Sequence, residues 1–142
     1  MKIKKATKKD FEEITKILKK ESSKKPYNEK YTLKKAFEEV KDFAKSELYL
    51  AEIEGEIVGF ISAYIVPENK EKAYIGELWL KEKFQGQGIG KVLTKFIEDK
   101  YKKLNVKLIR LVAKRNAGAF KFYKKLKYTE YKELVFMEKK LK

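Results

Sequence analysis

Residues 73–101 read AYIGELWLKEKFQGQGIGKVLTKFIEDKY, and this stretch decides the fold. Residues 73–80 are an aromatic and aliphatic run typical of a strand, and the apolar residues from Val92 to Tyr101 have the spacing of an amphipathic helix. Between them lies a glycine-rich loop, Gln85-Gly86-Gln87-Gly88-Ile89-Gly90. Glycine lets the backbone turn tightly and approach a ligand, and a helix N-terminus presents unpaired N–H groups with partial positive charge. The loop is therefore predicted to bind a phosphate or pyrophosphate.

Two better-known phosphate motifs do not fit this loop. A dinucleotide fingerprint that starts at Gly86 needs glycine where Lys91 stands. A Walker loop that ends in Gly90-Lys91 needs glycine where Gln85 stands, and serine or threonine where Val92 stands. A strand-to-helix turn without a ligand remains the alternative.

The residues before this stretch predict a strand, two helices and a hairpin. Helical spacing after Thr7 and Asp10 indicates a capped first helix, and Thr32 can cap a second. From Leu48 the apolar period changes to two, and Glu54-Gly55 supplies a tight turn. The predicted elements are a short strand near Ile3, helices over 11–18 and 33–44, a loop over 21–31, and strands over 48–53 and 56–66.

The residues after this stretch predict a strand, a helix and a last strand. Val106–Ala113 is nearly all apolar and indicates a buried strand, a helix follows from about Asn116, and Tyr128–Leu141 is expected to form a strand or hairpin arm. A right-handed crossover makes strands 73–80 and 106–113 parallel neighbours. The predicted class is α/β, with a mixed, mostly antiparallel central sheet and helices on both faces, in a single domain over residues 1–142.

Composition limits the chemistry that this chain can perform. It contains no histidine and no cysteine, which excludes disulfides, thiolate metal sites, a cysteine nucleophile and a Ser-His-Asp triad. Catalysis must therefore use carboxylates, tyrosine, lysine, backbone amides or a cosubstrate, and no metal site is expected.

The net charge of +15, from 36 basic and 21 acidic residues, raises the question of a nucleic-acid partner. Only Arg110 and Arg115 are arginines, and the lysines spread from Lys2 to Lys142; readers of base edges favour arginine. A solvated lysine-rich surface or a phosphate-rich small ligand fits better. No apolar run approaches the ~20 residues of a membrane span, and the N-terminus has no signal-peptide pattern, so the expected compartment is the cytoplasm.

Two motifs together resemble the GNAT family of N-acetyltransferases. The loop 85–90 matches the family's Arg/Gln-x-x-Gly-x-Gly/Ala motif. Residues 116–126, NAGAFKFYKKL, resemble its second signature, an asparagine after the fifth strand and a helix bearing Phe-Tyr. One helix and one strand separate the two motifs, as in the family. The family often has glycine then phenylalanine after this helix, whereas this chain has Lys127 and Tyr128, so the usual glycine cap is missing.

The resemblance implies the acyl-CoA N-acyltransferase fold, in which the sheet splays between the fourth strand, ending at Leu80, and the fifth, starting at Val106. It implies acetyl-CoA as donor, a primary amine as acceptor that attacks the thioester directly, no metal, and often a homodimer. Coenzyme A would be held by the Leu78–Leu80 backbone, by the loop amides and by the second motif. The implied contacts are Leu78, Trp79, Leu80, Gln85, Gly86, Gln87, Gly88, Ile89, Gly90, Lys91, Asn116, Phe120 and Tyr123.

The resemblance also suggests catalytic roles, each with a structural alternative. Tyr123 occupies the family's general-acid position, and a phenol with a pKa near 10 is protonated at neutral pH; packing on the sheet is the alternative. Glu77 stands where several members draw a proton from the amine through water; the alternative is a solvated or ion-paired carboxylate. Asn116 could instead cap its helix.

The acceptor side is expected in the loop between the first two helices. Tyr27, Asn28 and Tyr31 are candidates there, together with Glu77. The acceptor itself, a small amine, a peptide N-terminus or a protein lysine, stays open. Two other classes remain as alternatives: a lysine-rich nucleic-acid-associated protein, and an acyl-CoA-binding domain without turnover.

Overall fold

The computed structural model describes residues 1–141. Residues 1–112 form one compact unit, and the chain from Ala113 onward forms a second, much smaller one. The first unit holds the whole sheet and the first three α-helices. Over its described residues, 113–141, the second holds one helix.

A five-stranded sheet in the order β1-β2-β3-β4-β5 organises the first unit. Its strands are β1 (Lys2–Lys5), β2 (Glu47–Ile53), β3 (Glu56–Ile65), β4 (Lys72–Leu80) and β5 (Leu108–Arg110). The first four strands pair antiparallel, and β4 pairs parallel to β5. The predicted mixed sheet and the parallel crossover pair are therefore confirmed.

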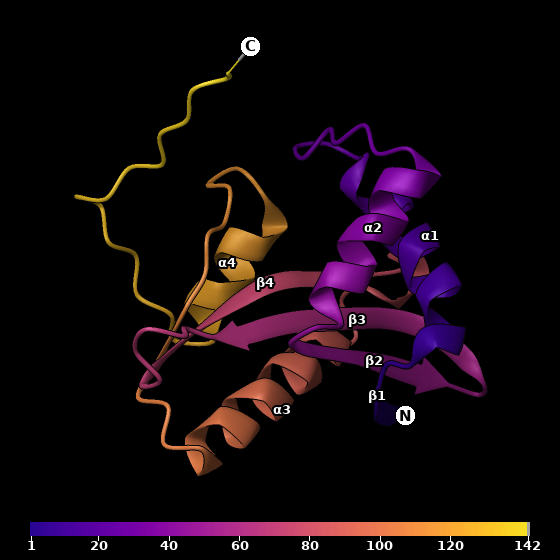
Figure 1. Ribbon diagram of the computed structural model, residues 1–142, viewed down its shortest axis with the longest axis horizontal. Helices are drawn as coiled ribbons and strands as arrows, with labels where there is room; N and C mark the ends of the chain where they lie inside the picture. The colour runs from indigo at the N-terminus through magenta and orange to yellow at the C-terminus, as the bar shows by residue number, and fades with distance from the viewer. Residues whose placement is uncertain (142) are drawn as a thin grey trace. The chain divides into compact units, whose positions relative to one another are not determined.

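Helices cover both faces of this sheet (Figure 1). The helices α1 (Phe11–Ser22) and α2 (Leu33–Phe43) lie on one face, and α3 (Ile89–Lys103) packs on the other. Short 3-10 turns precede α1, at Lys8–Asp10, and the glycine loop, at Glu82–Phe84. None of the helices in residues 1–141 has the length and apolarity needed to cross a membrane.

Local side-chain bonds lie at Thr7 and Thr32, where the sequence predicts helix caps; the first begins the 3-10 turn that leads into α1, and the second begins α2. The Asp10 carboxylate accepts hydrogen bonds from the Thr7 backbone N–H at 2.9 Å and from the Thr7 hydroxyl at 3.2 Å. The Thr32 hydroxyl accepts from the Lys35 N–H at 3.1 Å at the start of α2. Such caps typically contribute about 1 kcal/mol each.

Both faces of the sheet are buried, which explains why four successive residues of β2, Leu48–Ala51, are all apolar. Leu48 and Leu50 belong to the core under α1 and α2. Tyr49 points the other way and contacts the Phe96 ring of α3 at a centroid distance of 4.8 Å. Covering both faces removes from water the side chains that would otherwise alternate between core and solvent.

A β-bulge at Gly76 sets which face of β4 carries Glu77. Ser62 pairs with Glu77 and Ala63 pairs with Ile75, so Gly76 is the extra residue. Without the bulge, Glu77 would share the α3 face with Ile75. With it, Glu77 shares the α1–α2 face with Ser62 and Trp79.

The parallel pairing of β4 and β5 is short. It covers Lys72–Leu108, Ala73–Ile109 and Tyr74–Arg110 and then stops, so residues 75–80 have β3 on one side and no paired strand on the other. The sheet therefore opens between its fourth and fifth strands, as the family resemblance implied.

The predicted buried strand over Val106–Ala113 is wrong in length and burial. Only Leu108–Arg110 is a strand, and two of those three residues are exposed. The cause is position: β5 lies at the edge of the sheet, where it has backbone partners on one side only. An apolar composition alone cannot distinguish such an edge from a central strand.

The second unit contains α4 (Gly118–Lys125). The strand predicted over Tyr128–Leu141 is wrong, because these residues form turns and irregular chain. A strand needs a neighbouring strand for its backbone hydrogen bonds, and α4 is the only regular element of this unit among the described residues. The apolar side chains that suggested a strand, such as Val135, Phe136 and Met137, are exposed.

Lys127 adopts the conformation that glycine usually supplies after a helix. Its φ is 73°. The Lys127 N–H donates to the Lys124 carbonyl and the Tyr128 N–H donates to the Tyr123 carbonyl, each at 3.0 Å. These two bonds define a Schellman cap, so the turn is kept without its glycine, and Lys127 carries the strain of the left-handed region.

We expect Lys127→Gly to stabilise the protein by about 0.5–1 kcal/mol, because glycine adopts this φ without a Cβ penalty. Lys124→Gly is the matched control: it removes the same side chain inside α4 and should cost about 1 kcal/mol. Urea denaturation of both variants measures the difference. Equal destabilisation by both substitutions would show that the positive φ of Lys127 carries no strain.

Candidate functional site

The glycine loop leaves open space where side chains would otherwise project. Gly86 and Gly88 have φ values of 77° and 87°, and a Cβ built on either would meet no atom within 4 Å. Gly88 is also the N-cap residue of the 15-residue helix α3. The loop thus forms a backbone-lined cradle that side chains at these positions would fill.

The backbone N–H groups of this cradle have no acceptor in the protein. Within residues 1–141, the six N–H groups from Gly86 to Lys91 donate no hydrogen bond, and the first helical bond of α3 is from Val92 to the Gly88 carbonyl at 3.1 Å. Unpaired donors at the start of a long helix form an anion site. The loop geometry therefore fits the predicted phosphate group.

Side-chain hydrogen bonds fix the start of the glycine loop to its neighbours. The Gln85 amide donates to the Leu80 carbonyl at 3.0 Å and to the Glu21 carboxylate at 3.4 Å. Glu21 is 5% exposed and pairs with Lys24 at 2.9 Å. Gln85 therefore ties the loop to the end of β4 and to α1, which gives a physical reason for a long hydrogen-bond donor at the first position of the motif.

Two further loop residues differ in orientation. The Gln87 amide donates to the Lys83 carbonyl at 3.0 Å, so this side chain also folds back on the loop. Lys91 is exposed and has no ion-pair partner within residues 1–141, which leaves its ammonium group available to an anion at the helix start.

Glu77 is a half-buried carboxyl with a raised pKa. Burial raises the pKa of Glu77 to about 7, and the Glu39 and Glu29 carboxylates push it in the same direction. The Trp79 indole N–H, which donates to Glu77 at 3.4 Å, opposes the shift. A carboxyl that titrates near neutral pH can accept and release protons at physiological pH.

Two of the predicted acceptor-side residues, Tyr27 and Tyr31, interact electrostatically with Glu77. The Tyr27 ring meets the Trp79 ring edge-on at 4.8 Å, and burial and the Glu77 charge raise the pKa of Tyr27. Burial, then Glu39, Glu77 and Glu29, raise the pKa of Tyr31 to about 12. Asn28 is exposed, with a φ of 53°.

A cavity of about 330 Å³ opens beside Glu77 between α2 and the sheet. Tyr31 and Glu77, two of the residues predicted for the acceptor side, line it. Sequence analysis did not single out the other eight lining residues, because isolated residues on a helix or strand resemble an ordinary core or a solvated surface. The polar ones among them are Glu39, Asp42, Ser46, Ser62 and Tyr64.

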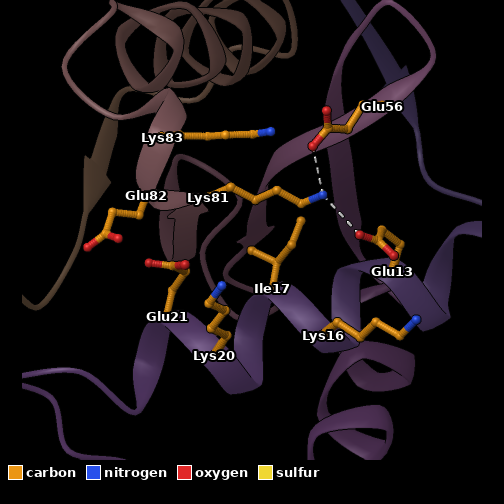
Figure 2. A pocket seen from close by; sticks show the side chains of 9 residues that line it. All are labelled: Glu13, Lys16, Ile17, Lys20, Glu21, Glu56, Lys81, Glu82 and Lys83. Carbon is orange, nitrogen blue, oxygen red and sulfur yellow. Dashed lines mark hydrogen bonds and ion pairs between the residues drawn. The ribbon is translucent and has the colours of Figure 1, made fainter.

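A larger hollow of about 520 Å³ lies between α1 and the end of β4 (Figure 2). Its central ammonium, on Lys81, pairs with Glu13 at 3.0 Å and Glu56 at 3.1 Å. Figure 2 shows lysine and glutamate side chains intermixed around it. This mixture of charges gives no preference for one kind of ligand.

The remaining predicted residues lie in the second unit. Asn116 is exposed and is not the helix cap, because α4 begins after Ala117; its capping alternative is therefore wrong. The Arg115 guanidinium lies 5.5 Å from the Phe120 ring centroid. Tyr123 is 7% exposed and packs edge-on against Phe122 and Tyr128, at 4.9 and 5.3 Å.

The chain belongs to the acetyltransferase (GNAT) family, whose pattern it matches over residues 11–128. An uncharacterized N-acetyltransferase of Methanocaldococcus jannaschii is 35% identical over 92 residues, which cover 61% of this chain. The match spans only 40% of that relative's length.

Solved structures show the same fold. A possible acetyltransferase from Clostridium difficile 630 superposes with a TM-score of 0.84 at 17% identity, covering 99% of this chain and 98% of its own. A PaiA N-acetyltransferase from Thermoplasma acidophilum, in complex with coenzyme A, has a TM-score of 0.71 at 25% identity, covering 88% and 87%. The fold predicted from the resemblance is confirmed.

The raised pKa of Glu77 predicts how the free energy of unfolding depends on pH. The folded chain binds this proton more tightly than an unfolded chain with the ordinary pKa of 4.5. Stability from this group is therefore complete below about pH 4.5 and is lost as pH rises through about 7. Relative to Glu77→Gln, the wild type should lose about 1–2 kcal/mol between pH 5 and pH 8, a value reduced for partial exposure.

Denaturation in urea at several pH values measures this difference. Glu68→Gln, which removes an exposed carboxyl in the turn before β4, is the control and should show no such trend. A gap between wild type and Glu77→Gln that stays constant from pH 5 to pH 8 would show that Glu77 titrates normally.

Proposed function

We propose that this protein is an N-acetyltransferase that moves an acetyl group from acetyl-CoA to a primary amine. The observation that carries the proposal is the row of six unpaired backbone N–H groups from Gly86 to Lys91, at the point where β4 loses its parallel neighbour. A phosphate-bearing donor with an extended arm fits this combination of an anion cradle and an open strand edge.

The donor would be held by backbone groups. The amides of residues 86–91 bind the pyrophosphate, Lys91 adds a cation, and the free edge of Leu78–Leu80 binds the extended arm. When bound, acetyl-CoA supplies an activated acetyl thioester. The hydrogen bond from the Gln85 amide to the Leu80 carbonyl fixes the position of the cradle relative to the strand edge. Acyl transfer needs such fixed positioning of the reacting groups.

Glu77 serves as the base. An amine is protonated at neutral pH and attacks only after it loses a proton. A Glu77 carboxylate with a pKa near 7 takes up that proton, directly or through one water, better than an ordinary carboxylate with a pKa of 4.5. The C–N bond then forms as the C–S bond breaks, and the Tyr123 hydroxyl gives its proton to the leaving sulfur. The second proton, which the acetylated nitrogen loses, returns Tyr123 to its neutral form.

Coenzyme A binding tests the cradle. We expect Gly88→Glu to weaken coenzyme A binding by about a hundredfold or more, because the side chain fills the cradle and adds a like charge. Gly55→Glu is the matched control, since Gly55 has a φ of 79° and equally open space but lies in the β2–β3 turn. Calorimetry measures both. Equal affinities of the two variants would rule out the cradle.

Turnover tests the general acid. We expect Tyr123→Phe to lower kcat by roughly a hundredfold while coenzyme A affinity changes little, because the phenol acts in the transition state. Tyr131→Phe, an exposed tyrosine, should keep full activity. Release of free thiol from acetyl-CoA is the readout. A Tyr123→Phe enzyme with unchanged kcat at every pH would show that Tyr123 is not the general acid. If the wild type releases no thiol from acetyl-CoA with any amine tested, a non-catalytic acyl-CoA-binding domain is favoured instead.

A further inference from the structure

The cavity beside Glu77 has the opposite charge to the rest of the protein. Three of its ten lining residues are acidic and none is a lysine or arginine, although basic residues outnumber acidic ones 36 to 21 in the chain. Such a local reversal of sign concentrates cations at one place on a surface that otherwise repels them.

The acids come from two walls of the cavity. Glu39 and Asp42 lie three residues apart, on one face of α2, and Glu77 lies on β4 beneath that helix. Figure 1 shows α2 lying across this face of the sheet. A ligand in the cavity is therefore bounded by Glu77 on the sheet side and by Glu39 and Asp42 on the helix side.

The helix-side acids are largely free to bind a ligand. Glu39 has no ion-pair partner within residues 1–141. Asp42 pairs with Lys45 at 3.1 Å, but both side chains are more than half exposed, and such pairs contribute little. A cation in the cavity can therefore bind Glu39 directly and compete with Lys45 for Asp42.

Ser62 supplies independent evidence for a polar ligand. It lines the cavity, is only 5% exposed, and pairs across the sheet with Glu77. Its hydroxyl makes no hydrogen bond to another group within residues 1–141 and is not among the side-chain atoms sealed from solvent. This hydroxyl is therefore available to a polar group that enters the cavity beside Glu77.

The other walls suit an aliphatic chain. Tyr31, Phe43 and Tyr64 line the cavity with rings, and aromatic faces attract both methylene groups and ammonium ions. The volume of about 330 Å³ lies at the small end of the range for small-molecule pockets.

We propose that this cavity selects a small aliphatic diamine or polyamine, whose first amino group reaches Glu77 and Ser62 and whose second, still charged, is held by Glu39 and Asp42. The inference rests on the proposed acetyltransferase function and names its acceptor. One charge is lost when Glu77 takes the proton of the attacking amine, and the other remains to position the substrate.

Steady-state kinetics with 1,4-diaminobutane and butylamine test this proposal, since the two differ by one terminal amino group. We expect kcat/KM to be about ten to a hundredfold higher for the diamine. Glu39→Gln combined with Asp42→Asn should lower the diamine-to-butylamine ratio of kcat/KM at least about tenfold, mainly through KM. Glu38→Gln makes the same charge change on an exposed position of α2 outside the cavity and should leave the ratio unchanged.

Calorimetry with 1,4-diaminobutane in the presence of coenzyme A separates this inference from the proposed function. Diamine binding that depends on Glu39 and Asp42 but without acetylation would support the site and contradict the acetyltransferase. Acetylation of both amines with equal kcat/KM, or acetylation of peptide amines alone, would overturn the diamine proposal and leave the acetyltransferase standing. A diamine that neither binds nor is acetylated would likewise overturn the diamine proposal.

Discussion

Pairing of β4 with β5 over only three residues is the constraint on which the rest of the site depends. The crossover through α3 brings the two strands together at Lys72–Tyr74, and their divergence leaves the edge of residues 75–80 open. The same crossover places the N-terminus of α3 directly after β4, so a strand edge with free backbone groups continues into six free helix and loop amides. A longer β5 would close this edge and remove the place for an extended donor.

The bulge at Gly76 adds the acceptor side to this arrangement. It places Glu77 on the α1–α2 face rather than the α3 face, where burial and the acidic groups of the loop and α2 raise its pKa to about 7. One extra residue in β4 therefore separates two environments along the same strand. In the proposed function, the backbone edge binds the anionic donor, and the side chains above it bind a cationic acceptor.

Local signals predicted much of the fold, because the interactions behind them are local. The Thr7–Asp10 cap, the Thr32 cap and the Glu54-Gly55 turn depend on residues within three positions of each other. The parallel pair followed from the handedness of crossovers. The strands predicted at Val106–Ala113 and Tyr128–Leu141 failed because a strand depends on a partner elsewhere in the chain, which apolar composition does not report.

On the backbone side, the sequence singled out the open glycine loop; on the side-chain side, it singled out only some of the residues that line the cavity beside Glu77. The glycine loop carries its own signal, since Gly86 and Gly88 adopt positive φ. The isolated Gly76 could have indicated the bulge. Glu39 and Asp42 could not be distinguished from other charged residues of α2 until the helix was placed over Glu77.

The central claim is that the amides of residues 86–91 bind the phosphates of coenzyme A. Nuclear magnetic resonance of ¹⁵N-labelled protein during titration with coenzyme A tests it residue by residue. The account predicts that the amide signals of Gly86, Gly88 and Gly90 shift strongly and exchange more slowly with solvent, while that of Gly55 stays in place. Saturating coenzyme A that leaves the loop amides unshifted and unprotected would contradict it.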